Sequence, residues 1–78
     1  MKIKFKKYRD EFKILDVDKK DLSEEGELIG YLMFGPVRWF VKFRCEDSIF
    51  HYTDMTDITR AMWYLNNQRQ MPEDLLIK

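Results

Sequence analysis

Apolar residues occupy every second position at the start of the chain, which is the period of a β-strand with one buried face. Ile3 and Phe5 alternate with three lysines, so residues 1–9 are predicted to form a strand whose outer side is coated with lysine. Such a coat is typical of an edge strand, because charge discourages pairing with other molecules. A binding role for the lysines is the alternative.

The alternation resumes in residues 12–17 after a charged break, but its parity changes partway along the segment. A bulge near Ile14 and Leu15 would reconcile the two parities, because one extra residue shifts the following side chains to the other face. The first two strands are therefore predicted to form a hairpin.

The longest apolar run in the chain covers residues 28–34, and strict alternation follows it. Gly35 and Pro36 separate the two segments, and both suit a tight reversal, since glycine tolerates positive φ and proline has a fixed φ. Beyond them the apolar residues fall on odd positions, at Val37, Trp39, Val41, Phe43 and Cys45. This pattern predicts a second hairpin at the centre of an antiparallel sheet, with residues 28–34 as a middle strand.

A short strand over residues 49–52 and a helix are expected in the last third of the chain. Candidate helix caps lie at residues 53–57, and the helix should run to about Gln70, before Pro72. Its apolar stripe has helical spacing, at Ile58, Ala61, Met62 and Leu65. The predicted fold is α+β, an antiparallel sheet of about five strands (two hairpins plus a short strand) packed by one C-terminal amphipathic helix.

The same helix carries a second stripe on the side opposite Ile58, formed by Arg60, Trp63, Tyr64 and Asn67. Tryptophan, tyrosine and arginine are enriched at the energetic centres of protein interfaces. These four residues are therefore the predicted partner-binding site. Alternatively, the apolar side chains of residues 71–78 fold back over Trp63 and make it part of the core.

The length of 78 residues favours one small α+β domain over residues 1–78, and 45% hydrophobic residues can supply its core. Fourteen basic residues balance fourteen acidic ones, so the whole molecule has no net attraction for nucleic acid or anionic membrane. Any electrostatic function must come from local patches. Residues 2–9 carry +5, and residues 10–27 carry eight acidic and three basic side chains, or −5.

The acidic connector, residues 16–27, partly matches a calcium-binding loop. The match fails at the sixth position, where Asp21 replaces the glycine that the sharp turn requires, and Lys20 replaces the preceding ligand. A solvated turn, with one helical turn near residues 22–25, fits the segment better. The sequence therefore predicts no metal and no cofactor.

No arrangement of residues points to an enzyme. His51 is the single histidine, and spacing places no nucleophile beside it. The single cysteine, Cys45, cannot form an internal disulfide and falls on the apolar side of its strand. No apolar segment reaches the length of a membrane span, so we expect a cytoplasmic protein without membrane contact.

Nucleic-acid binding is the alternative function, through a basic and aromatic sheet face formed by Arg38, Phe40, Lys42 and Arg44. A ring flanked by cations can stack on a base and hold phosphates. Residues 40–43 also match the last four positions of the RNA-recognition-motif signature, but the preceding positions and the expected element order do not.

The sequence thus predicts a small non-enzymatic protein-binding module that acts as an adaptor, inhibitor or regulator by occupying a partner's surface. Its partner would be another protein or a second copy of the chain, as a homodimer that uses the outer helix stripe or an open strand edge. Its small size and charge-rich composition are compatible with an accessory protein of a mobile element.

Overall fold

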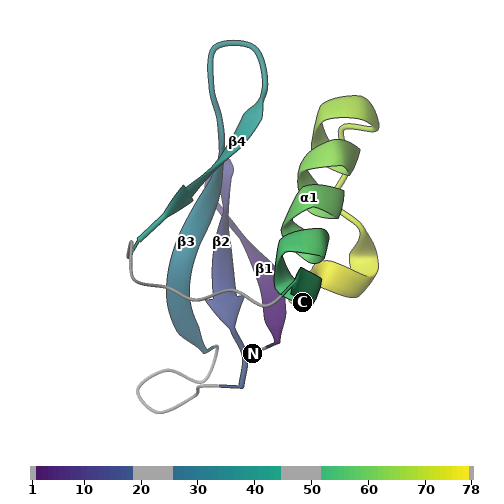
Figure 1. Cartoon of the computed structure of the whole chain (residues 1–78). Helices are drawn as coiled ribbons and strands as arrows, with labels where there is room; N and C mark the ends of the chain where they lie inside the picture. Colours follow the sequence, from purple (N-terminus) through teal and green to yellow (C-terminus); the bar gives the residue numbers. More distant parts are fainter. Residues whose placement is uncertain (1, 19–25, 45–51, 78) are drawn as a thin grey trace.

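The computed structural model describes residues 2–18, 26–44 and 52–77, which form an antiparallel sheet, a helix and one 3-10 turn (Figure 1). The sheet has the order β1-β2-β3-β4, so each strand pairs with its neighbour in sequence. The helix packs on one face of the sheet, and the 3-10 turn lies beside β1. The elements are β1 (Ile3–Tyr8), β2 (Glu11–Asp16), β3 (Glu27–Phe34), β4 (Trp39–Phe43), α1 (Tyr52–Asn67) and η1 (Glu73–Leu75).

The predicted α+β class and the C-terminal helix are confirmed, but the part of the chain that the structure describes has four strands instead of about five. Tyr52, the last residue of the predicted fifth strand, is the first residue of α1. Residues 49–51 lie outside the described ranges. A four-residue apolar segment is too short for its period to separate a strand from the start of a helix, which explains the error.

The first hairpin joins β1 to β2, as predicted. Phe5 pairs with Ile14 and Lys7 pairs with Phe12, so alternate side chains of both strands face α1. Arg9 occupies the turn with φ 56, a left-handed conformation that L-residues other than glycine adopt less readily. The tight turn thus fixes the register of the two strands.

A register shift lies between Ile14 and Leu15, where a bulge was predicted, but β2 keeps its alternation, since Leu15 pairs with Lys4 directly after Ile14 pairs with Phe5. Ile14 pairs with Gly30, whereas Leu15 pairs with Leu28, so Ile29 on β3 is the extra residue. A side chain at Gly30 would bring a Cβ within 2.6 Å of the Lys42 carbonyl oxygen. Glycine is therefore required here because the backbone of β4 approaches so closely.

The central hairpin turns at residues 35–38, where the Gly35 amide donates to the Arg38 carbonyl at 2.8 Å. The turn does not use the positive φ that glycine tolerates, because the positive-φ glycine of the described residues is Gly26. A Cβ at Gly35 would instead press on the Phe40 ring at 3.2 Å. Val37 lies in this turn and is 81% exposed, so its predicted place on the apolar side of the strand is wrong.

The core lies between one face of the sheet and α1. The predicted helix stripe is confirmed, since Ile58, Ala61 and Leu65 are buried and Met62 packs against them. On the sheet, β4 contributes Trp39, Val41 and Phe43 as partly buried neighbours of the core. The other core residues of the strands are Ile3, Phe5, Phe12, Ile14, Ile29 and Leu32.

Helix α1 ends at Asn67, three residues before the predicted end at Gln70. Arg69 has φ 55, so the backbone leaves the helix through a left-handed residue just after the last turn. This position is usually filled by glycine, which has no Cβ to clash. The sequence offers no glycine there, which explains why the end of the helix was predicted too late.

The C-terminal segment completes the core on the side of β1. Met71 and Leu75 are buried with the helix and strand residues. Leu76 forms a parallel bridge with Phe5, and the Ile77 amide donates to the Phe5 carbonyl at 2.8 Å. The tail therefore covers part of the outer edge of β1.

We expect Leu75→Ala to lower the free energy of unfolding by about 2 kcal/mol or more, because it removes a buried side chain whose space the tail cannot easily refill. Glu73→Ala is the matched control, since Glu73 is exposed in the same 3-10 turn and its loss should change the value by less than about 0.5 kcal/mol. Urea denaturation measures both. Equal, small effects would show that the tail is not part of the core.

We expect Arg69→Gly to raise the free energy of unfolding by about 0.5–1 kcal/mol, because glycine relieves the left-handed strain at the end of α1. Gln68→Gly should instead lower it, since Gln68 lacks a positive φ and glycine adds flexibility to the unfolded chain. Thermal unfolding of the two variants checks the difference. A loss of stability in Arg69→Gly would contradict it.

Candidate functional site

The outer face of α1, defined here by Arg60, Trp63, Tyr64 and Asn67, points away from the core. Trp63 is 51% exposed and Tyr64 is 39% exposed, although both belong to a helix whose other side is fully packed. Their rings meet edge to face, with centroids 5.1 Å apart. The two aromatic side chains therefore form one ordered apolar surface instead of two separate flexible groups.

The alternative in which the tail buries Trp63 does not occur. Leu75, Leu76 and Ile77 pack or pair on the side of β1, as described above. The indole of Trp63 stays half exposed. The core is thus completed without the outer face of α1.

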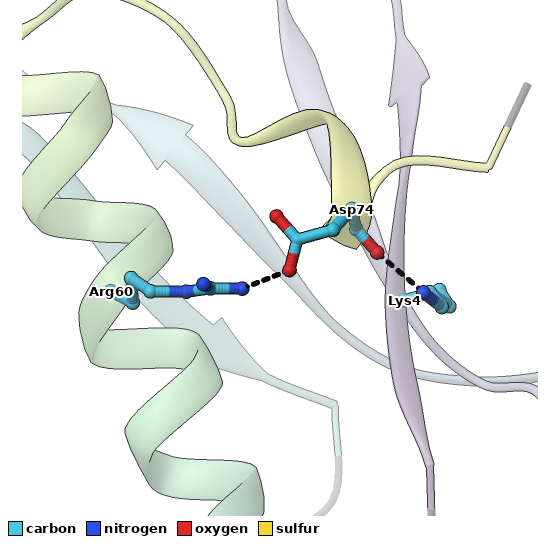
Figure 2. Close-up of polar contacts among 3 residues, drawn as sticks. All are labelled: Lys4, Arg60 and Asp74. Atoms are coloured by element: carbon cyan, nitrogen blue, oxygen red, sulfur yellow. Dashed lines mark hydrogen bonds and ion pairs between the residues drawn. The ribbon is translucent and has the colours of Figure 1, made fainter.

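Arg60 is engaged with the tail rather than pointing freely into solvent (Figure 2). Its guanidinium donates to the carboxylate of Asp74, with Nη2 and Oδ2 2.5 Å apart. The ammonium of Lys4 donates to the backbone carbonyl of the same residue. Asp74 therefore links α1 to β1 through the 3-10 turn, and Arg60 has a structural role whatever else it binds.

The contact shifts the titration of both partners. The hydrogen bond from Arg60, with the attraction of its positive charge, lowers the pKa of Asp74 below its ordinary value. The same bond raises the pKa of Arg60. Both side chains are substantially exposed, so solvent screens the pair and its contribution to stability is small.

The side chain of Asn67 is also used within the helix. Its amide donates to the Trp63 carbonyl at 2.8 Å, one turn earlier. The Trp63 carbonyl precedes the last four carbonyls of α1, so the bond from Asn67 adds a side-chain donor to a carbonyl inside the helix. Of the four predicted residues, the two rings are thus the ones most available to a partner.

An open groove of about 740 Å³ runs beside Trp63, between α1 and β4. Trp63, Met62 and Thr59 line it from the helix, and residues 37–41 line it from the sheet. A second hollow, between Met55 and Arg60, borders the other side of Trp63. The indole of Trp63 therefore lines both the groove and this second hollow.

Asn66 holds the groove together, and sequence reasoning missed it. Its side-chain oxygen accepts the Trp39 amide at 2.7 Å, and its side-chain nitrogen faces the Trp39 carbonyl at 3.5 Å. The side-chain amide thus pairs with the edge of β4 as a neighbouring strand would. No spacing rule relates a helical asparagine to a strand 27 residues earlier, so only the folded chain reveals this contact.

The pairing of β4 also defines what its edge offers. Hydrogen-bonded and non-hydrogen-bonded residue pairs alternate along an antiparallel hairpin. Arg38 and Arg44 belong to hydrogen-bonded pairs, with Gly35 and Ile29 respectively. The backbone groups of the odd residues in β4 therefore point away from β3. The bond from Trp39 to Asn66 agrees with this pattern. Val41 therefore directs its amide and carbonyl toward the outer edge of the sheet.

All four residues of the alternative set, Arg38, Phe40, Lys42 and Arg44, are exposed, whereas the odd residues between them pack against the core. The register places Phe40 and Lys42 of β4 on the sheet face opposite α1. Arg38, in the turn before β4, and Phe40 also line the groove beside Trp63. The same register places Tyr31 directly opposite Lys42, on the same face.

Other predictions concern residues that the structure does not describe. His51, Cys45 and most of the acidic connector lie outside the described ranges. Within those ranges, no three histidine, cysteine, aspartate or glutamate side chains gather as a metal site would require. The described part of the chain also contains no helix that is long and apolar enough to cross a membrane.

We expect the stabilising effect of Asp74 to depend on pH. Because the pKa of Asp74 is lowered by folding, the ion pair stabilises the protein above the ordinary value of 3.8 and loses this effect as the pH falls through the folded-state pKa. The difference in stability between the native chain and Asp74→Asn should be small at neutral pH and vanish in acid. A difference that grows in acid would contradict this sign.

Comparison with protein-family models, with curated proteins and with solved structures found no match to this chain.

Proposed function

We propose that this protein is a non-enzymatic protein-binding module, an adaptor, inhibitor or regulator that acts by occupying a partner's surface. One observation carries the proposal: Trp63 is half exposed on a well-packed helix, between two hollows, while the tail that could cover it packs elsewhere. A small domain gains stability from each ring that it buries, so an ordered exposed tryptophan favours a role in binding.

Trp63 and Tyr64 are the anchors of the proposed interface. Their edge-to-face contact restricts both side chains before binding, so their burial in an interface costs little conformational entropy. Asn67 fixes the backbone beneath the indole through its bond to the Trp63 carbonyl. Arg60 is the charged companion, and its bond to Asp74 holds it at the edge of this surface.

The groove beside Trp63 suits an extended segment of the partner. Such a segment would place apolar side chains against Met62 and Trp63 and reach the outward backbone groups of Val41. Arg38 lines the same groove and favours an acidic residue in the segment. The partner would then be recognised by main-chain hydrogen bonds and by one or two side chains.

A second copy of the chain is the other occupant that this surface could accept. An isologous dimer would bring the Trp63 side chains of both copies to the symmetry axis or pair the edges of two β4 strands. Sedimentation equilibrium of the purified chain separates the two cases. A dimer that Trp63→Ala dissociates would assign the surface to self-association.

The decisive test compares Trp63→Ala with Tyr8→Ala. Both remove one exposed aromatic side chain, from the outer face of α1 and from β1, respectively, and Tyr8 lines neither of the two hollows beside Trp63. Proteins captured from extracts of the source cells by the native chain should be lost with Trp63→Ala and retained with Tyr8→Ala. For a purified partner, we expect Trp63→Ala to weaken binding by about 30-fold or more, as is typical of an interface anchor.

Thermal unfolding provides the control for this experiment. Because the indole is half exposed, Trp63→Ala should change the unfolding free energy by less than about 1 kcal/mol. A large loss of stability would assign the ring to the core. Unchanged capture by a stable Trp63→Ala variant would refute the proposed interface.

A further inference from the structure

The face of the sheet opposite α1, called the open face here, carries a row of paired residues across all four strands, with a lysine on three of them. Lys6 pairs with Lys13, Lys13 pairs with Tyr31, and Tyr31 pairs with Lys42. Directly paired residues project to the same side of a sheet. Three lysines and a tyrosine therefore form one line across the sheet, over about 14 Å at the usual strand spacing.

This arrangement places like charges side by side. Lys6 and Lys13 are directly opposite one another in the first hairpin. Like charges in this position repel one another. Glu11 is the one acidic residue that the described strands place on this face, where it pairs with Tyr8. The open face is therefore positive although the chain as a whole is neutral.

Aromatic side chains lie beside the cations. Phe40 is 41% exposed and sits between Arg38 and Lys42, which share its parity. At the other end of the face Tyr8 is similarly exposed, and the Lys13 ammonium lies 4.4 Å from the centre of its ring. The face thus offers flat apolar rings at fixed positions among positive charges.

We propose that the open face binds single-stranded nucleic acid, as an activity separate from the protein-binding surface on α1. The lysine row would neutralise phosphates, and the Phe40 ring would stack on an unpaired base. A single strand fits better than a duplex, because stacking requires bases that are free of their partners and a four-stranded face is too broad for a groove. The ribose or deoxyribose sugar is left to the experiment.

The separation of charge within the fold supports this assignment. Asp57 lies on α1, and Glu73 and Asp74 lie on η1 beside the edge strand β1. Lys4, on the same side of β1 as Lys6, donates to the Asp74 carbonyl at this edge. A polyanion bound along Lys6, Lys13 and Lys42 would therefore lie apart from these three acidic residues.

The test measures fluorescence anisotropy of labelled single strands of about 15 nucleotides, oligo-dT and oligo-U, at salt concentrations from about 50 to 200 mM. The native chain should bind at low salt, and its affinity should fall as salt rises. Lys13→Glu and Lys42→Glu should each weaken binding by about tenfold or more and reduce the salt dependence. Phe40→Ala should weaken binding by a similar factor because it removes the stacking platform.

Lys7→Glu is the matched control for the two lysine variants, because it makes the same change of charge. Lys7 lies on β1 beside Lys6 but projects to the other face of the sheet, with its ammonium 4.8 Å from the Phe12 ring centre. Lys7→Glu should leave affinity close to that of the native chain. Trp63→Ala should do the same, so failure of the protein-binding proposal and failure of this one are distinguishable. Thermal unfolding of every variant checks that each is folded. If Phe40→Ala is unstable, Lys42→Glu still tests the open face, because Lys42 is exposed.

Heparin, which has anionic groups but no bases, completes the experiment. If Phe40→Ala weakens binding to the oligonucleotides and leaves heparin binding unchanged, the nucleic-acid assignment is supported. If heparin and oligonucleotides respond equally to all variants, the face attracts polyanions only and the proposal is overturned. Absence of oligonucleotide binding by the native chain at low salt, or an equal loss with Lys7→Glu, would also overturn it.

Discussion

The packing of one amphipathic helix on one face of a four-stranded sheet is the interaction on which the rest of the structure depends. Ile58, Ala61 and Leu65 are buried against the strands, and together with the strand residues they form the single core cluster of the described chain. Burial of apolar area is the main favourable contribution to folding in so small a protein. A sheet has two faces, and the described residues contain one α-helix, which packs on one of them. The other face of the sheet and the outer face of the helix therefore lie outside this core.

The C-terminal segment solves a related problem at the edge of the sheet. A strand edge presents unpaired backbone groups, and the Phe5 carbonyl accepts a hydrogen bond from Ile77 instead of remaining open. Leu75 adds a buried side chain at the same place, and Asp74 joins the segment to both α1 and β1 (Figure 2). At the opposite edge, Asn66 performs part of this function by pairing with Trp39. The two edges are thus protected unequally, and the less protected one borders the groove beside Trp63.

The two proposed surfaces differ in chemistry as well as position. The outer face of α1 is aromatic and adjoins an open groove, which suits the burial of a protein segment. The open face of the sheet is cationic, with rings set among lysines, which suits a flexible polyanion with bases. The two surfaces meet at β4, where Arg38 and Phe40 also line the groove beside Trp63, while Lys6 and Lys13 lie on strands farther from it. A protein of this kind could hold a partner beside a nucleic acid without any change in its own fold.

The sequence alone determined the elements that have a clear period. Alternation defined β1, β2 and β4, the parity change marked the bulge at Ile14 and Leu15, and the helical spacing of Ile58 and Leu65 gave the buried side of α1. These features depend on contacts that repeat every second or every third to fourth residue, so local order is enough to reveal them. The predicted place of Tyr52 in a strand and the helix end at Gln70 were wrong because ends and short segments lack such repetition.

The tertiary structure alone decided which surfaces remain exposed. Helical spacing grouped Trp63 with Tyr64, but the exposure of the indole depended on where a tail ten residues later would pack. In the same way, alternation placed Phe40 and Lys42 on one face, whereas only the strand register brought Lys13 and Tyr31 beside them. The bonds from Asn66 to Trp39 and from Arg60 to Asp74 join segments with no shared pattern. Such contacts are set by the three-dimensional path of the chain, since no periodicity relates residues on separate elements.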